Sequence, residues 1–336
     1  MKKSVILLVV LAASVLLLSA PLHHVPRASA QAELATRLPY RHAGIYNFTC
    51  NEWYNFTTDL DVYSLEVANI DGGYVSEILI GTNMTEFDNK SMVIALKFDY
   101  QLWNTTLNGI GGAYDIKVAD LDPTNPGLEA VVIQGSVLAG EYVDGLYVTI
   151  LNASNGAILR EANVTPSGGH PETMEIADFD PSRPGLEIAI VRTWTQAPLI
   201  MVLDKDLNVI WSTTDTSFQY LYHLEAWDYT GDGVPELIAG GWDGIVVWDI
   251  VSNAKVLEYY SDIGLPGSGR YGTLDTAIRL ADVNDDGEKE IIFGTAYGYV
   301  GCLSIDGTLL WNSTERVGTS KFQGILSIEI AEAVKN

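Results

Sequence analysis

Residues 282–294 read Asp-Val-Asn-Asp-Asp-Gly-Glu-Lys-Glu-Ile-Ile-Phe-Gly, an acidic loop that runs directly into an apolar segment. Oxygen-bearing side chains recur at every second position of the loop, which is how one short loop surrounds a hard cation. Gly287 permits the sharp bend that such wrapping requires. The stretch therefore predicts a calcium-binding loop that leads into a β-strand.

The acidic loop recurs four more times, with copies that begin at Asn69, Asp120, Asp178 and Asp228. A period of about fifty residues is typical of a solenoid or propeller array. We expect each copy to supply three or four oxygen ligands to a metal ion. The predicted ligands are Asp282, Asn284, Asp286 and Glu290; Asp228, Thr230, Asp232 and Glu236; Asp178, Asp180, Ser182 and Glu187; Asp120, Asp122, Thr124 and Glu129; and Asn69, Asp71 and Glu77.

Each loop lies between short strand patterns. An alternating run such as residues 277–282 precedes the loop, an apolar run follows it, and a third and fourth strand complete the repeat. The fourth strand often carries a tryptophan, as at Trp103, Trp211 and Trp311, and we expect these rings to pack between repeats. Four short antiparallel strands per repeat without helical periodicity predict an all-β fold, a β-propeller of six blades.

The predicted organisation is a signal peptide over residues 1–30 and one propeller domain over residues 31–336. The blades are expected over about 61–107, 113–162, 171–214, 222–260 and 275–314, with a last blade formed from 324–336 together with 33–60. In that last blade the first strand comes from 326–332, and 44–50 and 52–58 supply the third and fourth strands. Such a clasp removes open sheet edges. The alternative is donation of the last strand to a neighbouring subunit, which produces a polymer.

The N-terminal residues predict export. Lys2 and Lys3 precede an apolar run over 5–18, and the small residues Ala28 and Ala30 flank a cleavage position. The run is short for a membrane span, although an uncleaved anchor is the alternative. We expect a secreted or cell-surface protein that does not insert into the membrane after removal of the signal.

The charge excludes some partners. The formal net charge of −24 becomes −27 without residues 1–30, because that segment contains three basic residues and no acid. Nucleic acid and anionic membranes are therefore disfavoured as partners.

Modification sites agree with export. Sequons predict N-glycosylation, although Asn and Thr are also common at strand ends. The eight sequons are at Asn47, Asn55, Asn83, Asn89, Asn104, Asn152, Asn163 and Asn312. Cys50 and Cys302 are predicted to form a disulfide in an oxidising compartment.

At its loops the sequence resembles the FG-GAP (VCBS-like) repeat of integrin α-chain propellers and many exported proteins, over about residues 60–332. The loop at Asp282 fits fully, Thr230 replaces the second ligand of its loop, and Gly73 stands at the third ligand position of the loop at Asn69. The resemblance implies calcium as a structural ion, with four good loops and one weak loop. The alternative of metal-free Asx turns would leave alternate carboxylates repelling one another.

Two loops resemble a different group of propellers. The pattern D-x-D-P-x-x-P-G-L-E at Asp120 and Asp178 is similar to loops of rhamnogalacturonan lyase propellers. The tryptophan of the fourth strand is similar to that of quinone-dependent dehydrogenase propellers, but no cofactor residues carry over.

Catalytic motifs are not evident, because His42, His170 and His223 stand in no nucleophile, zinc or phosphate motif. We therefore predict a binding protein, not an enzyme, with a glycan or an extracellular protein as ligand and an adhesion, envelope or assembly role. The candidate ligand face comprises His170, Tyr222, His223, Arg270 and Tyr271. The alternative is a polysaccharide lyase with calcium near the central channel, which would need Lys117 and Arg279 to point inward as bases.

Overall fold

The computed structural model describes residues 5–11, 61–84, 90–98, 100–124, 127–135, 137–138, 141–142, 145–165, 170–193, 200–213, 215, 218, 221–241, 244–260, 278–284, 286–295, 298–313 and 327–333. Within these ranges the regular elements are all β-strands. In the same ranges we find no helix with the length and apolar character needed to cross a membrane.

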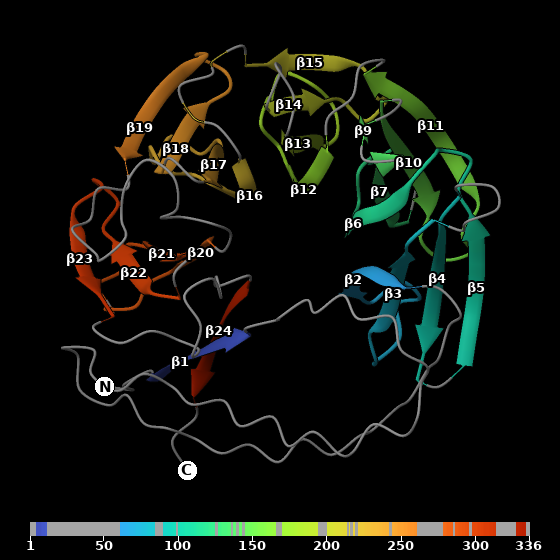
Figure 1. The fold of residues 1–336 in the computed structure, drawn as a ribbon, viewed down its shortest axis with the longest axis horizontal. Coiled ribbons are helices and arrows are strands. Elements are labelled where there is room, and N and C mark those ends of the chain that lie inside the picture. The colour runs from blue at the N-terminus through green and yellow to red at the C-terminus, as the bar shows by residue number, and fades with distance from the viewer. Residues whose placement is uncertain are drawn as a thin grey trace. The chain divides into compact units, whose positions relative to one another are not determined.

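Five four-stranded sheets follow one another along the chain (Figure 1). In each sheet, strands consecutive in sequence are neighbours, apart from the small β8–β9 insertion in the second. The first sheet contains β2 (Val62–Ala68), β3 (Glu77–Thr82), β4 (Met92–Lys97) and β5 (Tyr100–Thr106). The second contains β6 (Gly112–Ala119), β7 (Glu129–Gly135), β10 (Leu146–Asn152) and β11 (Ile158–Thr165).

The remaining three sheets repeat this order. The third contains β12 (His170–Ala177), β13 (Glu187–Thr193), β14 (Ile200–Leu203) and β15 (Val209–Ser212). The fourth contains β16 (Leu221–Trp227), β17 (Glu236–Gly241), β18 (Gly244–Asp249) and β19 (Ala254–Tyr260). The fifth contains β20 (Ile278–Ala281), β21 (Glu290–Gly294), β22 (Val300–Leu303) and β23 (Leu309–Asn312). The prediction of four short antiparallel strands per repeat is confirmed.

Two small sheets stand apart from this series. β8 (Val137–Leu138) pairs with β9 (Glu141–Tyr142), and β24 (Ser327–Ala333) pairs antiparallel with β1 (Val5–Leu11). A strand forms at β24 as expected, but its described partner comes from the N-terminal apolar run. Residues 44–58 lie outside the described residues, so the clasp and the signal peptide stay predictions.

The chain divides into two compact units. One combines residues 1–53, 240–246 and 257–336, and the other combines residues 54–239 and 247–256. The first three sheets belong entirely to the second unit, which also contains β16.

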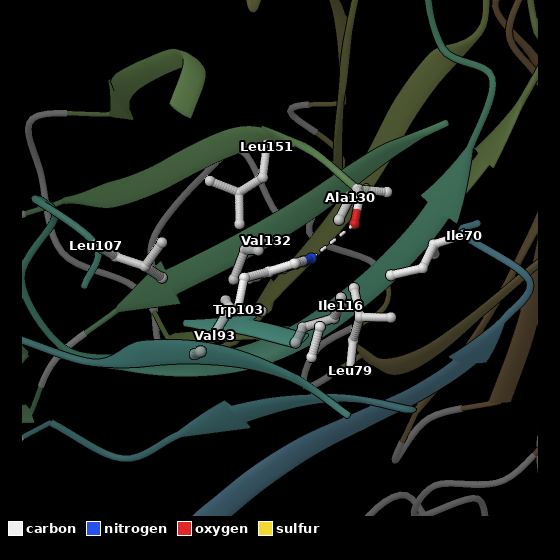
Figure 2. Packing of buried hydrophobic residues seen from close by; sticks show 12 residues of the cluster. Ile70, Leu79, Val93, Trp103, Leu107, Ile116, Ala130, Val132 and Leu151 are labelled. Carbon is white, nitrogen blue, oxygen red and sulfur yellow. Dashed lines mark hydrogen bonds between the residues drawn. The ribbon is translucent and has the colours of Figure 1, made fainter. Parts of the chain in front are cut away.

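The core of this unit is formed where neighbouring sheets pack face to face. Figure 2 shows Leu79 and Val93 of the first sheet beside Ile116 and Val132 of the second, all at most 1 % exposed, with the Trp103 ring among them. Burying each aliphatic side chain contributes about 1.5–3 kcal/mol. The tight packing explains why the second and third strands read as almost continuous apolar runs.

Two of the three predicted fourth-strand tryptophans, Trp103 and Trp211, join neighbouring repeats, as the sequence predicted. Trp103 of β5 donates its indole N–H to the backbone oxygen of Ala153 in the second sheet's hairpin, at 3.0 Å (dashed in Figure 2). Trp211 of β15 donates to Oδ1 of Asn253 at 2.8 Å and packs edge-on against Trp248, with 5.5 Å between ring centroids. Each ring therefore satisfies its one polar atom while burying apolar area.

Candidate cation loops and first-strand surface

The five acidic loops share one buried glutamate at their C-terminal end. We number them loop 1 (residues 69–77), loop 2 (120–129), loop 3 (178–187), loop 4 (228–236) and loop 5 (282–290). The glutamates are 0–2 % exposed, and in each loop Oε2 accepts the N–H of the residue after the first predicted ligand, at 2.6–2.9 Å. The five glutamates are Glu77, Glu129, Glu187, Glu236 and Glu290. A predicted metal ligand is thus also the group that closes its loop.

In loops 4 and 5 the second oxygen of this glutamate faces a neutral donor. Thr230 donates its hydroxyl to Oε1 of Glu236 at 2.9 Å, and Asn284 donates its amide N–H to Oε1 of Glu290 at 2.7 Å. These hydrogen bonds satisfy the buried carboxylates within the loops themselves.

The first aspartate of these two loops organises the bend. Asp228 accepts the N–H groups of Asp232 and Gly233 at 3.0 and 2.9 Å. In loop 5 the N–H groups of Asp286 and Gly287 donate to the first aspartate in the same way, at 3.1 and 2.9 Å. Gly287 has φ +96°, a left-handed conformation that glycine adopts without strain, so the predicted glycine bend is present.

Loop 1 differs, because a lysine ammonium lies inside it. Nζ of Lys97 lies 2.7 Å from Oε1 of Glu77 and also contacts Oδ2 of Asp71. The contact with Glu77 is an ion pair with a fully buried carboxylate. These contacts raise the pKa of Lys97, chiefly through the hydrogen bond to Asp71. Asn69 donates to the backbone oxygen of Gly73 at 2.6 Å.

Loop 2 holds an almost fully buried aspartate beside two basic side chains. Oδ2 of Asp122 lies 3.3 Å from Nζ of Lys205 and 3.6 Å from Nη2 of Arg160. A hydrogen bond from the Thr124 hydroxyl, at 2.6 Å, together with Lys205, lowers the pKa of Asp122 to about 2. This carboxylate therefore remains ionised and paired.

Loop 3 contains an unsatisfied acid. Oδ1 of Asp178 is buried and has no hydrogen-bond partner, while Asp180 accepts a hydrogen bond from Nε of Arg183 at 2.9 Å. Burial, together with the charges of Asp178 and Asp180, raises the pKa of Glu187 to about 7. An uncompensated buried oxygen beside further carboxylates fits an oxygen-seeking cation.

Metal binding stays a prediction for all loops. Across the described ranges, no three or more His, Cys, Asp or Glu side chains come together in a group able to hold a metal ion. Calcium also accepts amide, hydroxyl, backbone and water oxygens, which lie outside that set. The residues at loop 3 fit such an ion best, because among the described residues only Asp178 has a buried carboxylate oxygen with neither a hydrogen bond nor an ion pair.

A second polar region crosses four adjacent first strands, and we call it the first-strand surface. β2 contacts β6, β6 contacts β12, and β12 contacts β16. The surface consists of Glu66 of β2, Asp115 and Lys117 of β6, Glu175 of β12, and His223 and Glu225 of β16.

Of the six residues of this surface, Lys117 and His223 can carry a positive charge. His223 is charged only when it is protonated. Nζ of Lys117 lies 2.9 Å from Oε1 of Glu175. Burial lowers the pKa of Lys117, but the carboxylates of Glu175, Asp115 and Glu66 outweigh burial and raise it overall. The pKa of Glu175 rises to about 7, through burial first and the charge of Glu225 second, against the opposing effect of Lys117.

This geometry bears on the lyase alternative. A general base must lose its proton before it can abstract another, but Lys117 is held as an ammonium by its ion pair. Arg279 donates to the backbone oxygen of Ile278 at 3.0 Å, and a guanidinium stays charged in proteins. Neither basic residue is suited to the role that the alternative assigned to it.

The remaining predicted sites are only partly described. Tyr222 and His223 are half-buried on β16, and His170 opens β12 opposite Thr193, whereas Arg270 and Tyr271 lie outside the described residues. The ligand face therefore stays a prediction.

The predicted glycosylation sites are also only partly described. Asn104 and Asn163 are exposed, Asn83, Asn152 and Asn312 are half-buried, and Asn47, Asn55 and Asn89 lie outside the described residues. Glycosylation stays a prediction.

Cys302 is buried, and the pKa of its thiol is raised to about 12, first by burial and second by the charge of Glu290. Cys50 lies outside the described residues, so the disulfide also stays a prediction.

Sequence reasoning missed the basic residues of loops 1 and 2. For Lys97, the strand register could have indicated the contact. Ile78 pairs with Leu96 in the antiparallel β3–β4 ladder, so the next position places Lys97 opposite Glu77. Lys205 and Arg160 belong to other hairpins, and no local pattern pointed to them.

Comparison with known proteins shows the fold. No protein-family model and no curated protein matches this sequence. Among solved structures the chain is similar to Sqt1 of Saccharomyces cerevisiae, with a TM-score of 0.52, 12 % identity, and coverage of 78 % of this chain and 64 % of Sqt1. It is also similar to BBS1N in complex with ARL6DN, with a TM-score of 0.51, 12 % identity, and coverage of 75 % and 69 %.

The chain folds as a β-propeller. It spans about two thirds of the length of these neighbours, and at such low identity the likeness shows the fold alone. A quinohemoprotein alcohol dehydrogenase from Pseudomonas putida HK5 is also similar, with a TM-score of 0.46, 13 % identity, and coverage of 75 % and 52 %. A TM-score this low gives no information about enzymatic activity.

Proposed function

We propose that this chain is an exported β-propeller of the calcium-loop repeat type that binds an extracellular protein through its first-strand surface. Calcium at the loops without a built-in cation stabilises the fold. The observation that carries the proposal is the ion pair of Lys117 with Glu175, because it removes the free base that a lyase would use.

Charge favours a protein partner with basic side chains. The first-strand surface places three carboxylates around Lys117 and a fourth, that of Glu225, near Glu175, and the whole chain is strongly acidic. Acidic polysaccharides would be repelled by this surface, whereas a basic protein patch would be steered towards it.

The experiment compares two probes by fluorescence anisotropy on the mature protein. A labelled oligolysine peptide represents a basic protein patch, and labelled polygalacturonate represents an acidic glycan. We expect the peptide to bind and the triple variant Glu66→Gln, Glu175→Gln, Glu225→Gln to weaken that binding by about tenfold or more.

The control separates local charge from net charge. The variant Asp61→Asn, Glu288→Gln, Asp306→Asn removes three exposed acids outside the first strands. Equal weakening by both triple variants would contradict recognition at the first-strand surface. Cleavage of polygalacturonate with release of an unsaturated product would restore the lyase alternative.

A second candidate function is self-assembly, and a specific observation favours it. Leu65 and Val67 of β2 are each 58 % exposed. Leu65 pairs with Ile80 and Val67 pairs with Ile78, so the two exposed side chains lie on the same face of the first sheet as Ile80, which is only 8 % exposed. Ile80 belongs to a buried cluster on this face. We call this surface the outer face of the first sheet, and we propose a second copy of the chain as its occupant.

A further inference from the structure

The five loops differ in the residue at the second ligand position, and this difference decides how the buried glutamate is satisfied. Loops 4 and 5 have Thr230 and Asn284 there, and both donate a hydrogen bond to the glutamate. Loops 1, 2 and 3 have an aspartate, and an ionised carboxylate cannot donate. In these three loops the aspartate at the second position and the buried glutamate therefore need a cation between or beside them.

In loop 1 the side chain of Lys97 supplies that cation. Its ammonium contacts both Asp71 and Glu77, and the Glu77 side chain is fully buried while that of Lys97 is 16 % exposed. A buried carboxylate with no counter-charge is costly, so the lysine compensates a charge that water cannot reach.

The position of Lys97 is particular to the first sheet. It stands one residue beyond the Ile78–Leu96 pair, opposite Glu77. The corresponding partner of Glu129 is Asn152. In the third and fifth sheets, one step beyond the pairs Ile188–Leu203 and Ile291–Leu303, the corresponding residues are Asp204 and Ser304.

These other residues serve their own hairpin turns. Asn152 accepts hydrogen bonds from Ser154, Asp204 accepts them from Asp206 and Asn208, and Ser304 donates to Asp306. Of these four residues, only Lys97 is seen in the described part of the chain to contact the carboxylates of an acidic loop.

Loop 1 is also the loop that has no oxygen-bearing side chain at the third ligand position, because Gly73 stands there. We propose that the ammonium of Lys97 permanently takes the place of a metal ion in loop 1, so that this loop needs no calcium. The inference deepens the calcium part of the proposed function and rests on the loops being cation sites. Loop 2 follows the same principle with Lys205 and Arg160 beside Asp122.

Thermal unfolding of the mature protein tests the proposal in chelator and in calcium. Lys97→Met removes the ammonium and keeps an apolar stem of similar length. In chelator we expect the Tm of this variant to fall by about 5 °C or more, because Glu77 loses its counter-charge. Lys90→Met, which lies beyond the opposite end of β4, is the matched control and should change the Tm little.

Two further arms identify the cause. Adding Glu77→Gln to Lys97→Met should recover much of the lost Tm, because the buried charge is then absent. Calcium should raise the Tm of Lys97→Met by more than that of the wild type, and calorimetric titration should count one additional calcium ion in the variant.

The proposal fails if Lys97→Met is as stable in chelator as Lys90→Met, or if calcium adds no ion and no extra stability to the variant. The calcium part of the proposed function has a separate readout, namely the calcium response of the wild type. A wild type indifferent to calcium would contradict that part alone, since the coupling of Lys97 with Glu77 is measured in chelator.

Discussion

The glutamate that ends each acidic loop shows how this protein stabilises a buried carboxylate. Its Oε2 accepts a backbone N–H in all five loops, and in three of them its Oε1 contacts a different partner: Lys97 in loop 1, Thr230 in loop 4 and Asn284 in loop 5. Because an unpaired buried carboxylate costs several kcal/mol, the partner at Oε1 is as necessary as the glutamate.

Glu175 provides a prediction at the same scale. Its folded pKa of about 7 exceeds the ordinary value of 4.5, so the folded state binds more protons than the unfolded state between these values. The free energy of unfolding should therefore fall as pH rises from about 4.5 to 7, by up to about 1 kcal/mol per pH unit from this group. Asp115, Lys117 and Glu225 are the charged groups that act on it.

Urea unfolding of the wild type and Glu175→Gln across this pH range, in chelator throughout, measures the effect. The difference between the two curves isolates Glu175 from other titrating acids. Parallel curves for the two proteins would contradict the raised pKa.

At the scale of the element, the hairpins between third and fourth strands are shaped to receive the tryptophan of the preceding sheet. Gly156 has φ +73°, and a Cβ there would lie 2.5 Å from the Trp103 ring. Gly231 has nearly the same φ, +75°, but a Cβ there would meet nothing within 4 Å. Substituting each glycine by alanine therefore distinguishes the cost of backbone strain, which both variants share, from the cost of a steric clash, which only the Gly156 variant has.

We expect Gly231→Ala to cost about 1–2 kcal/mol, the strain of a left-handed alanine. Gly156→Ala should cost about 1–3 kcal/mol more, because the added methyl group displaces Trp103 from the interface between the sheets. Urea unfolding of both variants in chelator gives the comparison. Equal losses would show that the hairpin tolerates movement of the indole ring.

At the scale of the whole molecule, the first strands differ in what covers them. Leu65 is 58 % exposed, whereas the residues at its position in the other four repeats are buried. Those residues are Ile116, Met174, Leu224 and Ile278, at 0–2 % exposed. Exposed apolar surface of this kind marks an interaction site.

Light scattering coupled to size exclusion tests self-assembly through this face. We expect the wild-type protein to associate and Leu65→Glu to remain monomeric with an unchanged Tm, because the charge opposes burial of the face. A monomeric wild type whose Tm falls on the Leu65→Glu change would instead indicate that the chain covers this face itself.

Local sequence patterns were enough to predict the repeat, its strands and the sites of its loops. Alternation and loop composition are local properties, since a period of two and a glycine bend follow from the backbone. Thus the strands before and after Asp282, the bend at Gly287 and the role of Trp103 were all predictable.

Only the tertiary structure decided how each loop is neutralised. Lys97 reaches loop 1 across a strand pair, and Lys205 reaches Asp122 from the third sheet. It also showed that Lys117 is held by Glu175 of a neighbouring strand and is not a free base. The physical reason is that a charge responds to whatever lies within a few ångströms of it, and those neighbours are brought together by the packing of sheets far apart in sequence.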